Sequence, residues 1–189
     1  MRTFIAIELP KEIRDYLGNL EDALKATQGD VKWVEPKNIH LTLKFLGEID
    51  EPKKEKINSI LDAVAKEKSS YKIRISSLGA FPKLNFPRVI WVGADQGDTE
   101  TKEIAKILEE KIQKLGIPKE GRAFSSHITI GRTRSTKNRE KLVQELKNAA
   151  DFSGSNLEFT VTKITLFKST LTPTGPIYEV LKEANLKTT

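Results

Sequence analysis

The sequence contains two histidines, and both stand at the start of matching tetrapeptides. His40 begins His-Leu-Thr-Leu, and His127, 87 residues further on, begins His-Ile-Thr-Ile. Imidazole has an unperturbed pKa of about 6.5, so near neutral pH one ring can accept a proton while another donates one. Two histidines placed at random would rarely share three further matching positions. The pattern therefore predicts a catalytic site with a pair of histidines.

Each tetrapeptide fits a β-strand, in which successive side chains point to opposite faces. The aliphatic residues would face a core, while each strand would offer one imidazole and one hydroxyl on its other face. The hydroxyls of Thr42 and Thr129 can donate hydrogen bonds to phosphate oxygens, where negative charge accumulates. This set suits phosphoryl chemistry without a metal, such as the opening of a 2′,3′-cyclic phosphate by water.

Two other interpretations of the histidines fit the sequence less well. A single His beside Thr on a strand is usually a structural, hydrogen-bonded residue, but that does not explain why both histidines have matching neighbours. A zinc site would need third and fourth ligands, and no His-Glu-x-x-His motif or nearby acidic cluster supplies them. We therefore expect no metal. The Gly-rich loops that bind ATP or dinucleotides are also missing, so we expect no cofactor.

Composition limits the class of protein. The chain has 189 residues, of which 38% are hydrophobic and 31% charged, so we expect one domain over residues 1–189. No cysteine is present, which excludes disulfides, thiolate metal sites and cysteine nucleophiles. The net charge of +6 is compatible with RNA, although many basic proteins bind nothing acidic. The frequent Lys and Glu and the single Met hint at a thermophilic source.

Nothing in the sequence predicts a membrane protein. The first ten residues are charged too early for a signal peptide, and no apolar run approaches the ~20 residues of a membrane span. We expect a cytoplasmic protein with no membrane partner.

Hydrophobic periodicity predicts one α+β unit with short strands and amphipathic helices. One short motif occurs twice, which indicates a weak internal duplication. We expect a loop over 81–87 and a turn over 116–121. The predicted helices cover 10–24, 52–68, 99–115 and 137–150, and the predicted strands cover 3–8, 31–34, 40–46, 71–78, 89–92, 124–131, 157–167 and 177–186.

Three stretches carry a resemblance to a known family. They read RTFIAI at 2–7, WVEPKNIHLTLKFLG at 33–47 and FSSHITIGR at 124–132. They resemble the 2H phosphoesterases and, more narrowly, the RNA 2′,3′-cyclic phosphodiesterases, historically called 2′-5′ RNA ligases. The resemblance covers essentially the whole chain. It implies a bilobal α+β fold, in which two pseudo-symmetric lobes of antiparallel sheet plus helices surround a central cleft.

The resemblance also implies roles for individual residues. His40 would be the proton donor to the leaving ribose 3′-oxygen, and His127 the proton acceptor that activates water, giving a 2′-phosphate. Thr42 and Thr129 would hold the phosphate, and Arg132 would supply positive charge. The implied partners are RNA ends or cyclic nucleotides, among them tRNA fragments, and the implied state is a monomer. Reversible 2′-5′ ligation, cleavage of 2′-5′ linkages and non-catalytic binding of RNA or nucleotides stay open as alternatives.

Several neighbouring residues are ambiguous. Strict alternation would turn Arg132 away from His127 unless Gly131 introduces a bulge, and otherwise it is an ordinary exposed charge. Phe45 could stack a base, but alternation with Leu41 and Leu43 favours a place in the core. Many members of the family carry Pro where this chain has Ser126, with little expected effect on catalysis. Side chains that could contact RNA, or could equally pack or be solvated, are Trp33, Phe81, Trp91, Lys83, Arg88 and Arg122.

Overall fold

The computed structural model describes residues 1–150 and 156–188, and within them the fold is α+β, as predicted. The named strands form one nine-stranded sheet with antiparallel pairing, in the order β7-β4-β5-β6-β3-β1-β8-β9, and β2 pairs with β6. The strands are β1 (Arg2–Glu8), β2 (Val31–Trp33), β3 (His40–Glu48), β4 (Tyr71–Lys83), β5 (Phe86–Ala94), β6 (His127–Thr133), β7 (Glu158–Val161), β8 (Lys163–Thr172) and β9 (Gly175–Asn185).

Within the described parts of the chain, four α-helices and one short 3-10 helix accompany the sheet. They are α1 (Lys11–Lys25), η1 (Pro36–Asn38), α2 (Glu51–Glu67), α3 (Asp98–Gln113) and α4 (Arg139–Asn148), close to the predicted helical ranges. The periodicity is confirmed in α2, where Ile57, Leu61 and Val64 are buried on one face. The Asp50 side chain accepts a hydrogen bond from the Lys53 backbone N–H at 2.9 Å and so caps the start of that helix.

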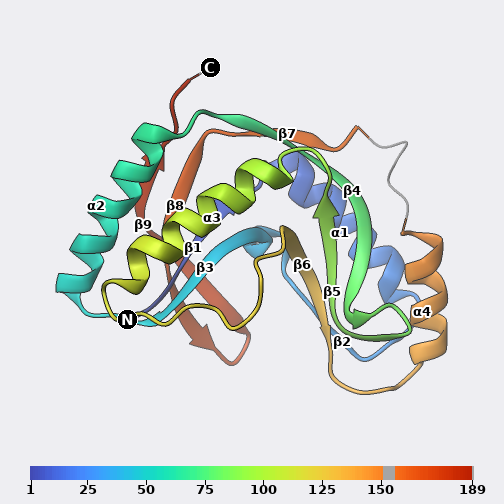
Figure 1. Ribbon diagram of the computed structural model, residues 1–189. Helices are drawn as coiled ribbons and strands as arrows, with labels where there is room; N and C mark the ends of the chain where they lie inside the picture. Colours follow the sequence, from blue (N-terminus) through green and yellow to red (C-terminus); the bar gives the residue numbers. More distant parts are fainter. Residues whose placement is uncertain (151–155, 189) are drawn as a thin grey trace.

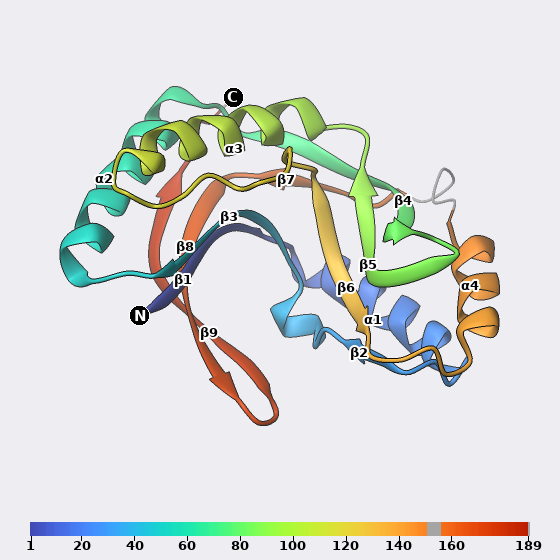
Figure 2. The ribbon, with the colours of Figure 1, turned by 60° about the horizontal axis from the view of Figure 1, so that its bottom comes forward.

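The sheet has two corresponding halves, which we call the first and second lobes. The first lobe contains β3, β1, β8 and β9, and the second contains β6, β5, β4 and β7. In Figure 1, α2 and α3 lie over the first lobe, while α1 and α4 lie at the other end beside β5 and β6. In Figure 2 the β8–β9 hairpin projects from the body. The central strands β3 and β6, which start with the two histidines, join the lobes.

Two predictions about the strands are wrong. The predicted loop over 81–87 is a tight hairpin, because β4 continues to Lys83 and β5 begins at Phe86. The predicted strand over 157–167 is interrupted at Thr162, since β7 pairs with β4 in the second lobe while β8 pairs with β1 in the first. The chain changes lobe at this residue, and local sequence contains no sign of which strand will be its partner.

A β-bulge in β3 overturns the prediction for Phe45. Thr42 pairs with Ala6 but Lys44 pairs with Ile5, so the bulge gives β3 one extra residue and reverses the alternation that follows. Lys44 is therefore buried, and Phe45 is 54% exposed on the face of the sheet that carries His40. The expectation that Phe45 packs in the core is wrong, because it assumed unbroken alternation.

Candidate active site

The pairing of β3 with β6 places both histidines on one face of the sheet. Leu41 pairs with Ile128, and both are buried at 1% exposure in the core. Continuing this antiparallel register by one residue on each side sets His40 across from Thr129 and Thr42 across from His127. The histidines are then diagonal neighbours, for which the typical separation is about 7–8 Å. All five predicted site residues thus lie on two adjacent strands, and this register places four of them, the two histidines and the two threonines, on one face.

Hydrogen bonds to backbone carbonyls fix the same tautomer in both imidazoles. His40 Nδ1 lies 2.7 Å from the Asn38 carbonyl oxygen, and His127 Nδ1 lies 2.8 Å from the Ser125 carbonyl oxygen. A carbonyl can only accept, so each Nδ1 carries a proton and donates it. In both neutral rings Nε2 is consequently the basic nitrogen.

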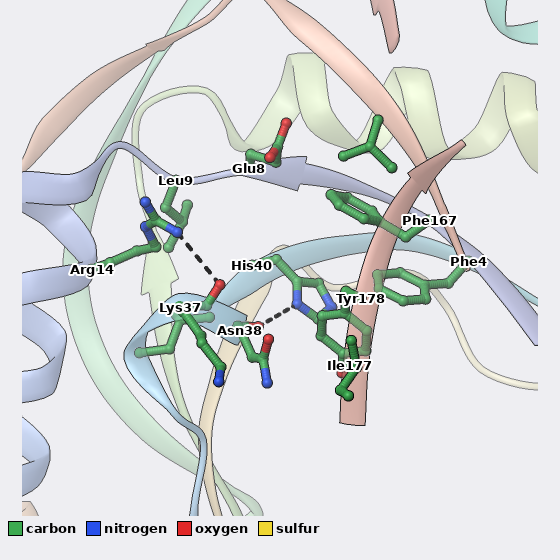
Figure 3. Close-up of a pocket in the computed structure, with 12 residues that line it drawn as sticks. Phe4, Glu8, Leu9, Arg14, Lys37, Asn38, His40, Phe167, Ile177 and Tyr178 are labelled. Atoms are coloured by element: carbon green, nitrogen blue, oxygen red, sulfur yellow. Dashed lines mark hydrogen bonds between the residues drawn. The ribbon is translucent and has the colours of Figure 1, made fainter. Parts of the chain in front are cut away.

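Aromatic side chains surround both imidazoles. Phe4 stacks on His40 with 4.8 Å between ring centroids, and Tyr178 meets it edge-on at 5.4 Å, as Figure 3 shows. On the second lobe, Phe81 meets His127 edge-on at 5.1 Å, and Trp91 lies 6.5 Å away. Sequence reasoning missed Tyr178, because it reaches His40 from β9, at the far edge of the sheet, and no local motif marks it.

Burial lowers the pKa of both histidines below the ordinary value. For His40, desolvation outweighs the opposing effect of the hydrogen bond to the Asn38 carbonyl. For His127, desolvation again dominates, the bond to Ser125 opposes it, and the charge of Arg132 lowers the pKa further. Both rings therefore lose their protons more readily than an exposed histidine, which favours a neutral base.

The two threonines stand beside the imidazoles, as the alternation predicts. Thr42 Oγ1 lies 2.9 Å from His40 Nε2, so this hydroxyl marks the region that Nε2 can reach. Thr42 and Thr129 are both partly exposed, while Leu43 and Ile130 beside them are buried. Both threonines therefore lie on the face of the sheet that carries the histidines.

A second bulge turns Arg132 toward the histidines. In β6, Thr129 pairs with Trp91 but Gly131 pairs with Ile90, so Ile130 is the extra residue. Arg132 then pairs with Val89, two residues from Trp91, and shares a face with Thr129. Its electrostatic effect on His127 agrees with this placement. The difficulty over its orientation is thus resolved by a bulge next to Gly131, where Trp33 packs so closely that a Cβ would lie 2.9 Å from its ring.

The two bulges fall at equivalent positions but present different side chains. After each His-x-Thr the strand gains one residue, and the next side chain on the face of the histidines is Phe45 in β3 and Arg132 in β6. The buried residue before it is Lys44 in one case and Gly131 in the other. The two His-x-Thr segments are therefore nearly symmetric, while the adjacent side chains distinguish an apolar half-site from a cationic one.

The other side chains that the sequence singled out are partly buried in the second lobe and partly exposed at the surface. Trp91 packs across Gly79 and Gly93, with its indole Nε1 buried and lacking a hydrogen-bond partner, so it forms part of the wall beside His127. Ser126 is buried, and its hydroxyl also lacks a partner. Lys83, Arg88 and Arg122 are exposed. In residues 1–150 and 156–188 no group of three or more His, Asp or Glu side chains could hold a metal ion.

Comparison with known proteins places the chain in a family. The model of the LigT like Phosphoesterase family matches residues 7–91 and again residues 92–178. The chain belongs to this family of phosphoesterases. The double match agrees with the indicated internal duplication and confirms the bilobal fold implied by the resemblance.

Relatives of known name span the full chain. The RNA 2′,3′-cyclic phosphodiesterase of Methanocaldococcus jannaschii is 39% identical over 97% of this chain and 99% of its own length. That of Thermotoga maritima is 35% identical over 99% and 96%. Both organisms are thermophiles, in line with the hint from composition. The crystal structure of Escherichia coli LigT with 3′-AMP superposes with a TM-score of 0.79 at 25% identity, covering 98% of this chain and 97% of that one.

Over residues 1–150 and 156–188, no helix combines the length and apolarity that crossing a bilayer requires.

Proposed function

We propose that this protein hydrolyses 2′,3′-cyclic phosphates at RNA ends to 2′-phosphomonoesters, with His40 as general acid and His127 as general base. The observation that supports it best is the register of Leu41 with Ile128, which sets the two histidines diagonally on one face of the sheet. Diagonal neighbours are typically about 7–8 Å apart at the backbone, so both side chains are within reach of one phosphate above the sheet. The names of the relatives point to the same substrate.

The mechanism moves one proton at each side of the phosphorus. In the neutral ring of His127 the proton is on Nδ1, so Nε2 has a free lone pair. Nε2 accepts a proton from water as the water oxygen bonds to phosphorus. The bond from phosphorus to the ribose 3′-oxygen breaks in line, and protonated His40 donates its Nε2 proton to that oxygen. The products are a 2′-phosphate and a 3′-hydroxyl, and the two imidazoles have exchanged charge states.

Neighbouring hydrogen-bond donors and one positive charge would stabilise the transition state. The Thr42 and Thr129 hydroxyls would donate hydrogen bonds to the two non-bridging oxygens, one from each strand. Arg132 would add a positive charge from the second lobe. The step needs neither a metal nor a nucleotide cofactor, because the attacking water, both proton carriers and the phosphate ligands are all accounted for by these residues.

The test uses a short RNA with a 2′,3′-cyclic phosphate end, incubated with excess EDTA. We expect full activity and a product that carries its phosphate on the 2′-oxygen. His40→Ala and His127→Ala should each lower kcat by about 10²–10⁴-fold, and the double variant should be little worse, because the rings act as a unit. Lys56→Gln, on the exposed side of α2, is the control.

Other outcomes would identify the alternatives. Loss of activity in EDTA with recovery on zinc would contradict the metal-free mechanism, and full activity in either alanine variant would contradict the histidine pair. RNA with a 5′-hydroxyl is added in a parallel reaction, in which a joined product would reveal ligase activity. Tight binding without turnover would show a non-catalytic RNA-binding module.

A further inference from the structure

A pocket of about 410 Å³ adjoins His40 on the first lobe. Its lining includes residues of β1, α1, η1, β8 and β9 but neither His127 nor either of the two threonines. The Asn38 side chain donates a hydrogen bond to the Pro176 carbonyl at 3.0 Å and so holds η1 against β9. Figure 3 shows the pocket, with Arg14 and Lys37 on one side and Tyr178 on the other. The pocket therefore extends the site in one direction only.

The polar side of this pocket has unused capacity to bind an anion. The Nε of Arg14 is buried and lacks a hydrogen-bond partner, and one of its terminal nitrogens donates only a long 3.4 Å bond to the Lys37 carbonyl. The Lys37 ammonium pairs with Glu35 at 2.7 Å and is 72% exposed, so it can turn toward a ligand. A guanidinium with unfilled donors matches a phosphate.

The single carboxylate in the pocket lining is already engaged. Glu8 lies 3.2 Å from the Lys163 ammonium, which also pairs with Glu183, and accepts a hydrogen bond from the Thr165 hydroxyl at 3.2 Å. The shared ammonium compensates part of its charge and so reduces its repulsion of an incoming anion. The opposite wall is apolar, with Tyr178 and the exposed side chains of Ile177 and Val180. A cationic side facing an apolar wall suits a nucleotide, which carries both kinds of surface.

We propose that this pocket binds the phosphate on the 5′ side of the terminal nucleoside, so that the upstream RNA strand leaves across the first lobe. The proposal rests on the proposed function, because it takes the ribose to lie beside His40. The strand direction would explain how nearly symmetric imidazoles acquire different roles. The ring nearer the ribose protonates the leaving oxygen, and the open side beside His127 admits water.

The experiment compares two substrates that differ by one phosphate. These are adenosine 2′,3′-cyclic phosphate and the same compound with a 5′-phosphate. We expect the enzyme to prefer the 5′-phosphorylated compound in kcat/KM, and Arg14→Gln and Lys37→Gln each to reduce that preference by about tenfold, the usual effect of losing one charge-assisted hydrogen bond. Lys56→Gln should leave the preference unchanged. No preference in the wild type, or equal losses on both substrates in the variants, would overturn the proposal.

A binding measurement separates this proposal from the proposed function. Adenosine 2′-phosphate and adenosine 2′,5′-bisphosphate are titrated into the protein by calorimetry, which requires no turnover. Tighter binding of the bisphosphate that Arg14→Gln abolishes supports the pocket even if hydrolysis fails. Equal affinities, or a preference lost in Lys32→Gln, which stands opposite Arg132 on the second lobe, would overturn it.

Discussion

Lys44 is a fully buried basic side chain, and its replacement should be costly. Its side chain is 0% exposed, and Nζ donates to Glu109 Oε2 at 2.9 Å and to the Pro118 carbonyl at 3.2 Å. The other oxygen of Glu109 accepts a hydrogen bond from the Glu120 backbone N–H at 2.8 Å. One buried ammonium thus ties β3 to α3 and to the segment that leads to His127.

The perturbation is Lys44→Met, which keeps the length of the side chain and removes its charge. Breaking a buried ion pair by removing one partner typically costs about 3–5 kcal/mol. Glu109 is 21% exposed and can recruit water, so we expect about 2–3 kcal/mol here, a large part of the roughly 5–15 kcal/mol that stabilises a typical domain.

The assay is guanidinium denaturation followed by fluorescence, with the free energy of unfolding extrapolated linearly to water. The matched control is Lys102→Met, which breaks the exposed pair of Lys102 with Asp98 on α3 and should cost at most about 1 kcal/mol. Equal losses in the two variants would refute the assignment of Lys44 as a buried tie. The hydrogen bond from Lys44 to the Pro118 carbonyl holds the segment that precedes His127. For that reason kcat should fall in Lys44→Met and not in the control.

Two further predictions concern the histidines. The dependence of kcat/KM on pH should be bell-shaped, because activity rises as His127 loses its proton and falls as His40 loses its own. Its maximum should lie below pH 6.5, because burial lowers the pKa of both histidines. A maximum above pH 6.5 would contradict this. Gly79→Ala should lower stability by about 1–3 kcal/mol and reduce kcat, since its methyl group would overlap the Trp91 ring beside His127. Thermal melts and initial rates would check it, with Gly121→Ala, where the added methyl meets nothing within 4 Å, as the control that should leave both unchanged.

Sequence reasoning was most successful where chemistry is encoded locally. Alternation within His-x-Thr was enough to predict that His40 and Thr42 share a face, and that Leu41 and Leu43 are buried. The repetition of the motif indicated two related halves, which the double family match confirms. Helical periodicity predicted the buried face of α2. Each of these features depends on residues that are close together in the chain.

Tertiary structure decided what depends on pairing between distant strands. Phe45 is exposed and Lys44 buried because a bulge against β1 reverses the alternation, and an equivalent bulge against β5 turns Arg132 toward His127. Tyr178 reaches His40 only because the sheet brings β9 back to η1. A bulge adds a single residue to one strand relative to its partner, so it is a property of the pair: Gly131 indicated that a bulge could occur in β6, but only the pairing decided that it does.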